Sequence, residues 1–124
     1  MPDDPLEQLR AICLTFPEAT EKLAWDTIPT FRVREKIFAQ YERNHHSVGR
    51  SALWCKAPPG IQGMLVGSNP ERFFVPPYVG HHGWVGVWLD GVVDWGEVAD
   101  LVDESYRMTV PKRLLVLLAQ PKGD

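Results

Sequence analysis

The chain lacks the sequence features that mark disulfide-rich, membrane-spanning and secreted proteins. It carries only two cysteines, Cys13 and Cys55, and no CxxC or Cys/His ligand spacing, so we expect buried free thiols in a reducing cytoplasm. No apolar run approaches the roughly 20 residues that span a bilayer. The start, MPDDPLEQLR, is acidic where a secretory signal would be basic and then apolar. The sequence therefore predicts a soluble cytoplasmic protein without a membrane partner.

Positive charge is also scarce, since the net charge is −3 at pH 7. Such a chain does not suggest a tight nucleic-acid or membrane binder. The charges are nevertheless separated along the sequence. Residues 32–72 hold seven bases and three acids, whereas residues 90–104 hold six acids and no base. We therefore expect a basic end and an acidic end in the folded molecule.

Motifs of catalysis and phosphate binding are missing too. The sequence contains no GxxxxGK, GxSxG or HExxH pattern. Both cysteines fall on predicted inward faces, which are poor positions for a nucleophile. One acidic cluster on a predicted helix indicates solvated surface, with weak cation binding as the alternative: Glu97, Asp100, Asp103 and Glu104. We expect a non-enzymatic protein with no cofactor and no metal.

What is present predicts one α+β domain over residues 1–124, because 44% of the residues are hydrophobic and helix and strand periods alternate. Capping signals at Asp4 and Asp94 begin two helices. Close spacing of the strands favours antiparallel hairpins, so we expect a single antiparallel sheet with helices packed on one face, in the order α-β-β-β-β-α-β-α-α. The predicted strands are 22–25, 30–34, 36–42, 51–57 and 83–89; further helices are expected at 58–67 and after Pro111. The predicted core comprises Leu9, Ile12, Phe31, Phe38, Leu53, Val85, Val87, Leu101 and Val102.

The adjacent histidines His81 and His82 lie between Gly80 and Gly83. Glycines on both sides favour a tight turn before a strand, and the lip of a ligand pocket is the alternative. A metal site is the least favoured interpretation. Adjacent residues of a strand point to opposite faces, and zinc needs three or four convergent ligands.

Four stretches resemble the MmcQ/YjbR family of small bacterial proteins: TFRVREKIFAQY (30–41), LWCKAP (53–58), RFFVPPYVGHHGWVGVWL (72–89) and ESYRMTVPKR (104–113). They occur in order and cover most of the chain. The resemblance implies a CyaY-like α+β fold with two β-hairpin wings, and DNA binding is the role usually attached to such proteins. Similar proteins often have glycine where this chain has Glu35, in the turn before Lys36.

The two predicted hairpins are basic, as a double-wing protein requires. Seven residues are candidates for nucleic-acid contacts: Arg32, Arg34, Lys36, Arg43, His45, His46 and Arg50. Arginine and lysine offer fixed charges to phosphates, and the histidines add charge below about pH 6.5. Because the body of the protein is negative, we expect weak, sequence-tolerant DNA binding. The alternative is a charged surface that only keeps the domain soluble.

Aromatic residues crowd the segment 73–95, more than a core of this size can bury. Core packing accounts for part of them. The functional alternative is a shallow groove that binds a protein, a small planar ligand or the bases of a single nucleic-acid strand. The candidate groove residues are Phe74, Tyr78, His81, His82, Trp84 and Trp88. Strand alternation also places Trp54 on the face opposite Leu53.

Overall fold

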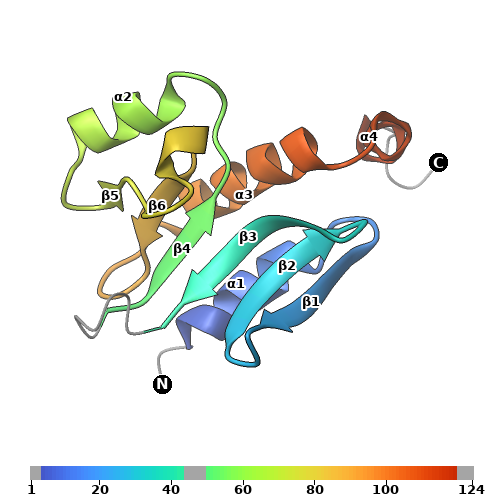
Figure 1. Cartoon of the computed structure of the whole chain (residues 1–124), viewed down its shortest axis with the longest axis horizontal. Coiled ribbons are helices and arrows are strands. Elements are labelled where there is room, and N and C mark those ends of the chain that lie inside the picture. Colours follow the sequence, from blue (N-terminus) through green and yellow to red (C-terminus); the bar gives the residue numbers. More distant parts are fainter. Residues whose placement is uncertain (1–3, 44–49, 120–124) are drawn as a thin grey trace.

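The structure, a computed structural model, describes residues 4–43 and 50–119 (Figure 1). The helices are α1 (Pro5–Cys13), α2 (Ile61–Ser68), α3 (Trp95–Thr109) and α4 (Lys112–Ala119), with the 3-10 helix η2 (Gly80–His82). The strands are β1 (Ala19–Ala24), β2 (Ile28–Val33), β3 (Lys36–Glu42), β4 (Ala52–Cys55), β5 (Phe73–Phe74) and β6 (Val85–Trp88). No helix in the described segments is long and apolar enough to cross a membrane.

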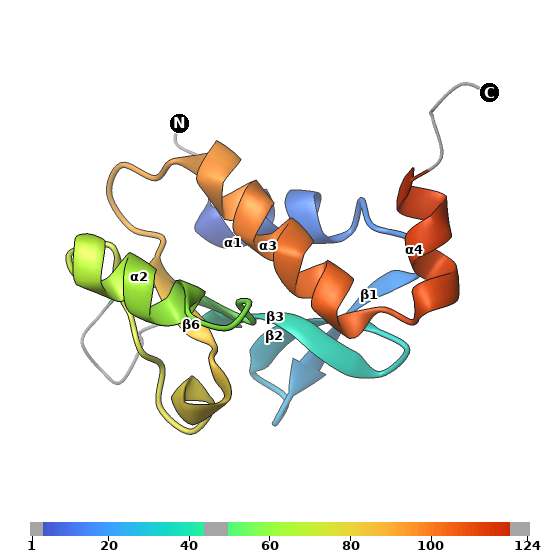
Figure 2. The ribbon, with the colours of Figure 1, turned by 90° about the horizontal axis from the view of Figure 1, so that it is seen from above.

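The strands form one sheet in the order β1-β2-β3-β4-β6-β5, and every neighbouring pair is antiparallel. Helices α1 and α3 lie on one side of this sheet (Figure 2). The predicted α+β fold with one antiparallel sheet is therefore confirmed. Strand β5 was not predicted, because a strand of two residues is too short to show alternation of apolar and polar residues.

The predicted starts of α1 and α3 are correct, whereas the helix predicted over 58–67 is α2 (Ile61–Ser68) and begins three residues later. The Asp4 carboxylate accepts a hydrogen bond from the backbone N–H of Leu6 at 3.3 Å, and Pro5 occupies the first turn. Asp94 caps α3 by accepting from the N–H of Glu97 at 3.1 Å. These caps satisfy backbone donors that a helix leaves unpaired at its N-terminus.

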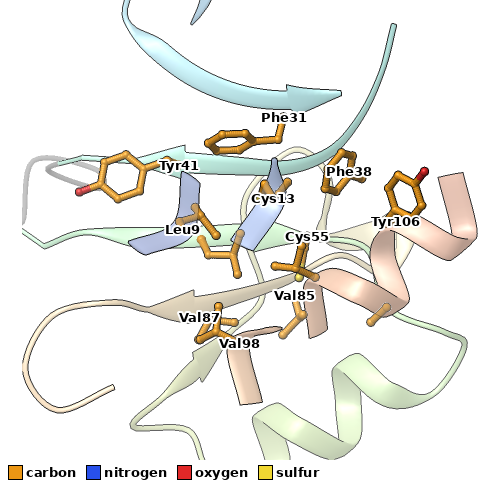
Figure 3. Packing of buried hydrophobic residues seen from close by; sticks show 14 of the residues in the cluster. Leu9, Cys13, Phe31, Phe38, Tyr41, Cys55, Val85, Val87, Val98 and Tyr106 are labelled. Carbon is orange, nitrogen blue, oxygen red and sulfur yellow. The ribbon is translucent and has the colours of Figure 1, made fainter. Parts of the chain in front are cut away.

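The core lies between the sheet and the helices α1 and α3 (Figure 3). Seven of the nine predicted core residues are buried: Leu9, Phe31, Phe38, Leu53, Val85, Val87 and Val102. The other two, Ile12 and Leu101, are half-buried and pack against its edge. Tyr106 of α3 joins the layers, since its ring stacks on Phe16 with a centroid distance of 4.6 Å and meets the edge of Phe38 at 5.2 Å.

Helix α3 docks on a β-bulge in β3. Phe31 pairs with Ala39 and Arg32 with Ile37, so Phe38 is an extra residue without a partner on β2. The carbonyl of Phe38 instead accepts a hydrogen bond from the buried hydroxyl of Ser105 at 2.6 Å. That hydroxyl also accepts from the N–H of Lys56 at 2.9 Å, just beyond β4. One side chain thus satisfies two backbone groups that the ladder leaves unpaired.

Helices α1 and α3 cover one face of the sheet and not the other (Figure 2). The face toward α1 and α3 carries the paired row Glu21, Phe31, Ala39, Cys55 and Val85. The opposite face, called the open face below, carries the row Lys22, Thr30, Gln40, Trp54, Gly86 and Phe74. Neither α1 nor α3 covers the open face (Figure 2).

The β2–β3 hairpin closes through a two-residue turn with backbone strain. Val33 pairs with Lys36, and the two residues between them, Arg34 and Glu35, have φ of 51° and 68°. Two central residues with positive φ are what a type I′ turn requires, and this turn strongly favours Asn-Gly. A side chain in this region costs about 1–2 kcal/mol.

Substitution of Glu35 by glycine is therefore expected to stabilise the domain. The relief of strain exceeds the extra entropy that glycine gives the unfolded chain, about 0.4–1 kcal/mol, so the free energy of unfolding should rise by about 0.5–1 kcal/mol. Urea unfolding followed by circular dichroism measures the change. Glu35→Ala is the control, because it removes the carboxylate but keeps a Cβ, and it should not stabilise. Equal effects of the two substitutions would contradict the strain argument.

Candidate functional site

A pocket of about 560 Å³ lies on the open face. Its lining comes from the β1–β2 turn, the middle of the sheet and the segment before η2: Trp25, Ile28, Gln40, Glu42, Trp54, Tyr78 and Val79. In Figure 2 the β1–β2 turn and the segment around η2 both extend from the side of the sheet opposite α1 and α3. The pocket therefore lies between two projections, with the sheet as its floor.

Two exposed aromatic residues flank this pocket. Trp25 and Tyr78 are 80% and 79% exposed, although large aromatic side chains are usually well buried. Both have left-handed backbones, with φ of 49° and 69°. Bulky residues rarely adopt this conformation, and residues held in it concentrate at binding and active sites. Backbone strain and side-chain exposure thus occur in the same two residues, one in the β1–β2 turn and one in the segment before η2, on either side of the pocket.

The floor of the pocket is aromatic at its centre and polar at one end. Trp54 of β4 pairs with Gln40 of β3, so both side chains lie on the open face. Trp54 is only 5% exposed. Two residues along β3, Glu42 lies on the same face, and its carboxylate accepts a hydrogen bond from Gln40 Nε2 at 2.6 Å. This bond fixes the carboxylate at the pocket wall.

The segment that carries Tyr78 is held by α2. Gln62 of α2 donates through Nε2 to the carbonyls of Gly80 at 2.7 Å and of Trp84 at 2.6 Å. Gly80 has no room for a side chain, since a Cβ there would lie 2.4 Å from Val75 Cγ1. The segment between β5 and β6 is therefore tightly folded, and Tyr78 has a defined position beside the pocket.

Of the predicted groove residues, the structure places only Tyr78 in the pocket lining. Phe74 and Trp88 contact each other with ring centroids 4.4 Å apart, and the ring of Phe74 lies where a Cβ of Gly86 would be. Trp84 is half-buried outside the lining. Those three rings pack against the protein itself. The sequence pattern places Trp54 on the correct face but does not link it to a pocket. It gives no signal for five other lining residues: Trp25, Ile28, Gln40, Glu42 and Val79.

The His81-His82 pair lies in the 3-10 helix η2, whose C-cap Gly83 has a left-handed φ of 88°. The expected turn before β6 is thus present. Both histidines are exposed, and their rings lie 3.9 Å apart because they share a helical turn and not a strand. Within the described residues, no group of three His, Cys, Asp or Glu side chains could hold a metal ion.

The basic candidates fall at opposite ends of β3. Arg32, Arg34 and Lys36 lie at the β2–β3 turn, whereas Arg43 and Arg50 flank the β3–β4 connection. Seven residues of strand separate these ends by roughly 20 Å. The structure therefore places the five cations in two groups, one at each end of β3. The other two candidates, His45 and His46, lie outside the described residues.

Two of these arginines are engaged with carboxylates. Arg34 binds Glu18 through Nε at 2.5 Å and Nη2 at 3.1 Å. Arg50 binds Asp90 through Nε at 2.9 Å and Nη2 at 3.1 Å, and its guanidinium lies 3.9 Å from the ring centroid of Trp88. The guanidinium of Arg50 holds the pKa of Asp90 below its ordinary value of 3.8. Much of the charge expected for phosphate contacts is thus neutralised within the fold.

Neither cysteine is available for nucleophilic chemistry. Cys13 and Cys55 are fully buried as free thiols. Burial raises the pKa of Cys55 to about 12 and raises that of Cys13 as well, with a further increase from Cys55 beside it. The thiolate is the reactive form, and it is therefore nearly absent at neutral pH.

Comparison with known proteins identifies relatives by family and fold. The YjbR family model matches residues 14–108. A search of curated proteins gives no match. Among solved structures, the chain is similar to the crystal structure of Deinococcus radiodurans protein DR2400, a DUF419 domain, with a TM-score of 0.75 and 21% sequence identity. The match covers 98% of this chain and 97% of that chain, and it shows a shared fold.

The contacts of Arg50 predict a structural role for this residue. Arg50→Ala should lower the free energy of unfolding at pH 7 by about 1–2 kcal/mol, since it removes a half-exposed ion pair and a cation–π contact. Lys36→Ala is the control, because Lys36 is exposed and has no ion pair within the described residues; it should change stability by less than about 0.5 kcal/mol.

The loss of unfolding free energy caused by Arg50→Ala should also depend on pH. The lowered pKa of Asp90 determines whether this loss grows or shrinks as the pH falls. A depressed pKa in the folded state stabilises the fold above the unfolded-state value, near 3.8, and this stabilisation disappears as the pH falls through the folded-state value. Urea unfolding at pH 7 and pH 3 should therefore give a smaller difference between wild type and Arg50→Ala at pH 3. An equal difference at both values would contradict the ion pair.

Proposed function

The chain belongs to the YjbR family, and we propose that it is a binding module whose ligand, a small organic molecule, occupies the pocket on the open face. The observation that carries this proposal is an open hollow of about 560 Å³ lined by three aromatic side chains, two of them exposed on strained backbone. Small-molecule pockets usually measure about 300–1,000 Å³ and combine apolar walls with a few polar groups. Gln40 and Glu42 are the polar groups here.

We propose binding without catalysis. Among the residues that the structure describes, the pocket lining offers one carboxylate, Glu42, and no histidine, cysteine, serine or lysine beside it. General acid–base and nucleophilic catalysis both need a second titratable group within hydrogen-bond distance of the first. The only hydrogen-bond partner of Glu42 within the described chain is the amide of Gln40, which cannot exchange a proton at neutral pH.

The test is a thermal-shift screen of small planar compounds, with hits titrated by tryptophan fluorescence, since Trp25 and Trp54 line the pocket. Trp25→Ala and Tyr78→Ala should each weaken a hit by about five- to tenfold, because an aromatic contact contributes about 1–1.5 kcal/mol. Met64→Ala is the matched control: Met64 is also apolar and 58% exposed, but it lies on α2 outside the lining. Hits that bind wild type and both pocket variants equally would contradict the proposal, as would a screen without hits.

A second candidate function is weak DNA binding at the turn end of the β2–β3 hairpin. The specific observation is a pair of neighbouring bases there, Lys36 and Lys56, with Arg32 on the adjacent strand β2. The pKa of Lys56 is lowered by burial and, to a smaller extent, by the positive charge of Lys36. Arg32 and Lys36 have no ion pair within the described residues, so they remain available to phosphates.

Three contacts predict a slope of log affinity against log salt of about −2 to −3 for duplex DNA. The double substitution Lys36→Ala/Lys56→Ala should reduce the size of this slope by up to about two units. Arg43→Ala, at the other end of β3, is the control and should leave the slope unchanged. A slope that does not respond to the loss of both lysines would refute this candidate.

A further inference from the structure

The polar end of the pocket carries a negative charge, the carboxylate of Glu42. Within the described residues this carboxylate has one partner, the neutral amide of Gln40, and no ion pair. The described part of the lining contains no lysine, arginine or histidine. The neighbouring cation, Arg43, has its guanidinium over the ring of Tyr41, which belongs to the core side of the sheet. Lys22 and Arg32 are farther along the open face, toward the β2–β3 turn. Arg50 lies over Trp88, in the same row as Glu42, but its guanidinium is paired with Asp90.

Three aromatic rings complete this arrangement. Trp25, Trp54 and Tyr78 line the same hollow as Glu42. The faces of such rings carry negative potential and attract cations, with tryptophan the strongest. A carboxylate at one wall and aromatic rings at the others therefore favour a positively charged occupant over a neutral or anionic one.

The chemistry of the lining also restricts the kind of cation. A primary ammonium has three N–H donors that all need acceptors once it leaves water, and among the described lining side chains only Gln40, Glu42 and the hydroxyl of Tyr78 offer them. A quaternary ammonium has no N–H, and its charge is spread over methyl groups that contact aromatic faces. Its transfer into this pocket leaves no unpaired donor.

We infer that the pocket recognises a small organic cation with a quaternary ammonium group, held between Trp25, Trp54 and Tyr78 and paired with the carboxylate of Glu42. This inference rests on the proposed function and specifies its ligand. The net charge of −3 supports the approach of such a cation. Binding should weaken at high ionic strength, because the partly exposed carboxylate is screened by salt.

The test compares choline with its neutral isostere 3,3-dimethylbutan-1-ol, titrated into the full chain by tryptophan fluorescence at low salt. Choline should bind at least tenfold more tightly, since only the charge differs. Glu42→Gln should weaken choline about five- to tenfold and leave the neutral isostere unchanged, because glutamine keeps the shape and can still accept from Gln40. Trp25→Ala should weaken both compounds.

The possible results of this titration distinguish a failure of the cation inference from a failure of the proposed small-molecule pocket. Equal affinity for the two compounds, or choline binding that Glu42→Gln does not alter, would overturn the cation inference while leaving a pocket that binds neutral ligands. Absence of choline binding would overturn the cation inference as well. The thermal-shift screen of planar compounds would then test separately whether the pocket binds any small molecule. A circular dichroism spectrum of Glu42→Gln identical to that of wild type shows that any loss is not one of folding.

Discussion

The hydroxyl of Ser105 is the contact on which the two-layer arrangement depends. It bonds the carbonyl that the bulge at Phe38 leaves unpaired and the N–H of Lys56 beyond β4. Leaving a buried backbone group without a partner costs about 1–3 kcal/mol, so α3 is bound to the sheet at this register by more than apolar packing. With α3 fixed there and Tyr106 packed on Phe38, one face of the sheet is closed. The other face is left to the side chains that line the pocket.

On that open face the strand register brings polar and aromatic groups together. Gln40 is opposite Trp54 and Glu42 is two residues along, so alternation alone puts the three on one surface. Two projections then enclose them, and each places an aromatic residue on a left-handed backbone. Left-handed backbone also occurs at Glu18, Arg34 and Glu35, outside the pocket lining, so strain alone does not mark a binding site. What distinguishes Trp25 and Tyr78 is that their exposed side chains line the pocket, and this supports the proposed ligand site.

Much of the fold could be predicted from the sequence, because its signals are local. Caps at Asp4 and Asp94 and the alternation in residues 36–42 and 51–57 depend on neighbours within a few positions. The pocket could not be predicted in the same way. Trp25 and Tyr78 are far apart in the chain and meet only through the β1–β2 turn and the segment that Gln62 holds in place. Nor does composition reveal that Arg50 pairs with Asp90, because that contact joins two distant loops.

If Trp25 and Tyr78 serve a ligand and not the fold, their removal should not destabilise the protein. The decisive measurement is the free energy of unfolding of Trp25→Gly and Tyr78→Gly in urea. Glycine removes about 1–2 kcal/mol of left-handed strain, and side chains that are about four-fifths exposed contribute little burial. Both variants should therefore be as stable as wild type or more stable. A loss of more than about 1 kcal/mol in either variant would show that these aromatic residues hold the fold together, and would contradict their assignment to a binding site.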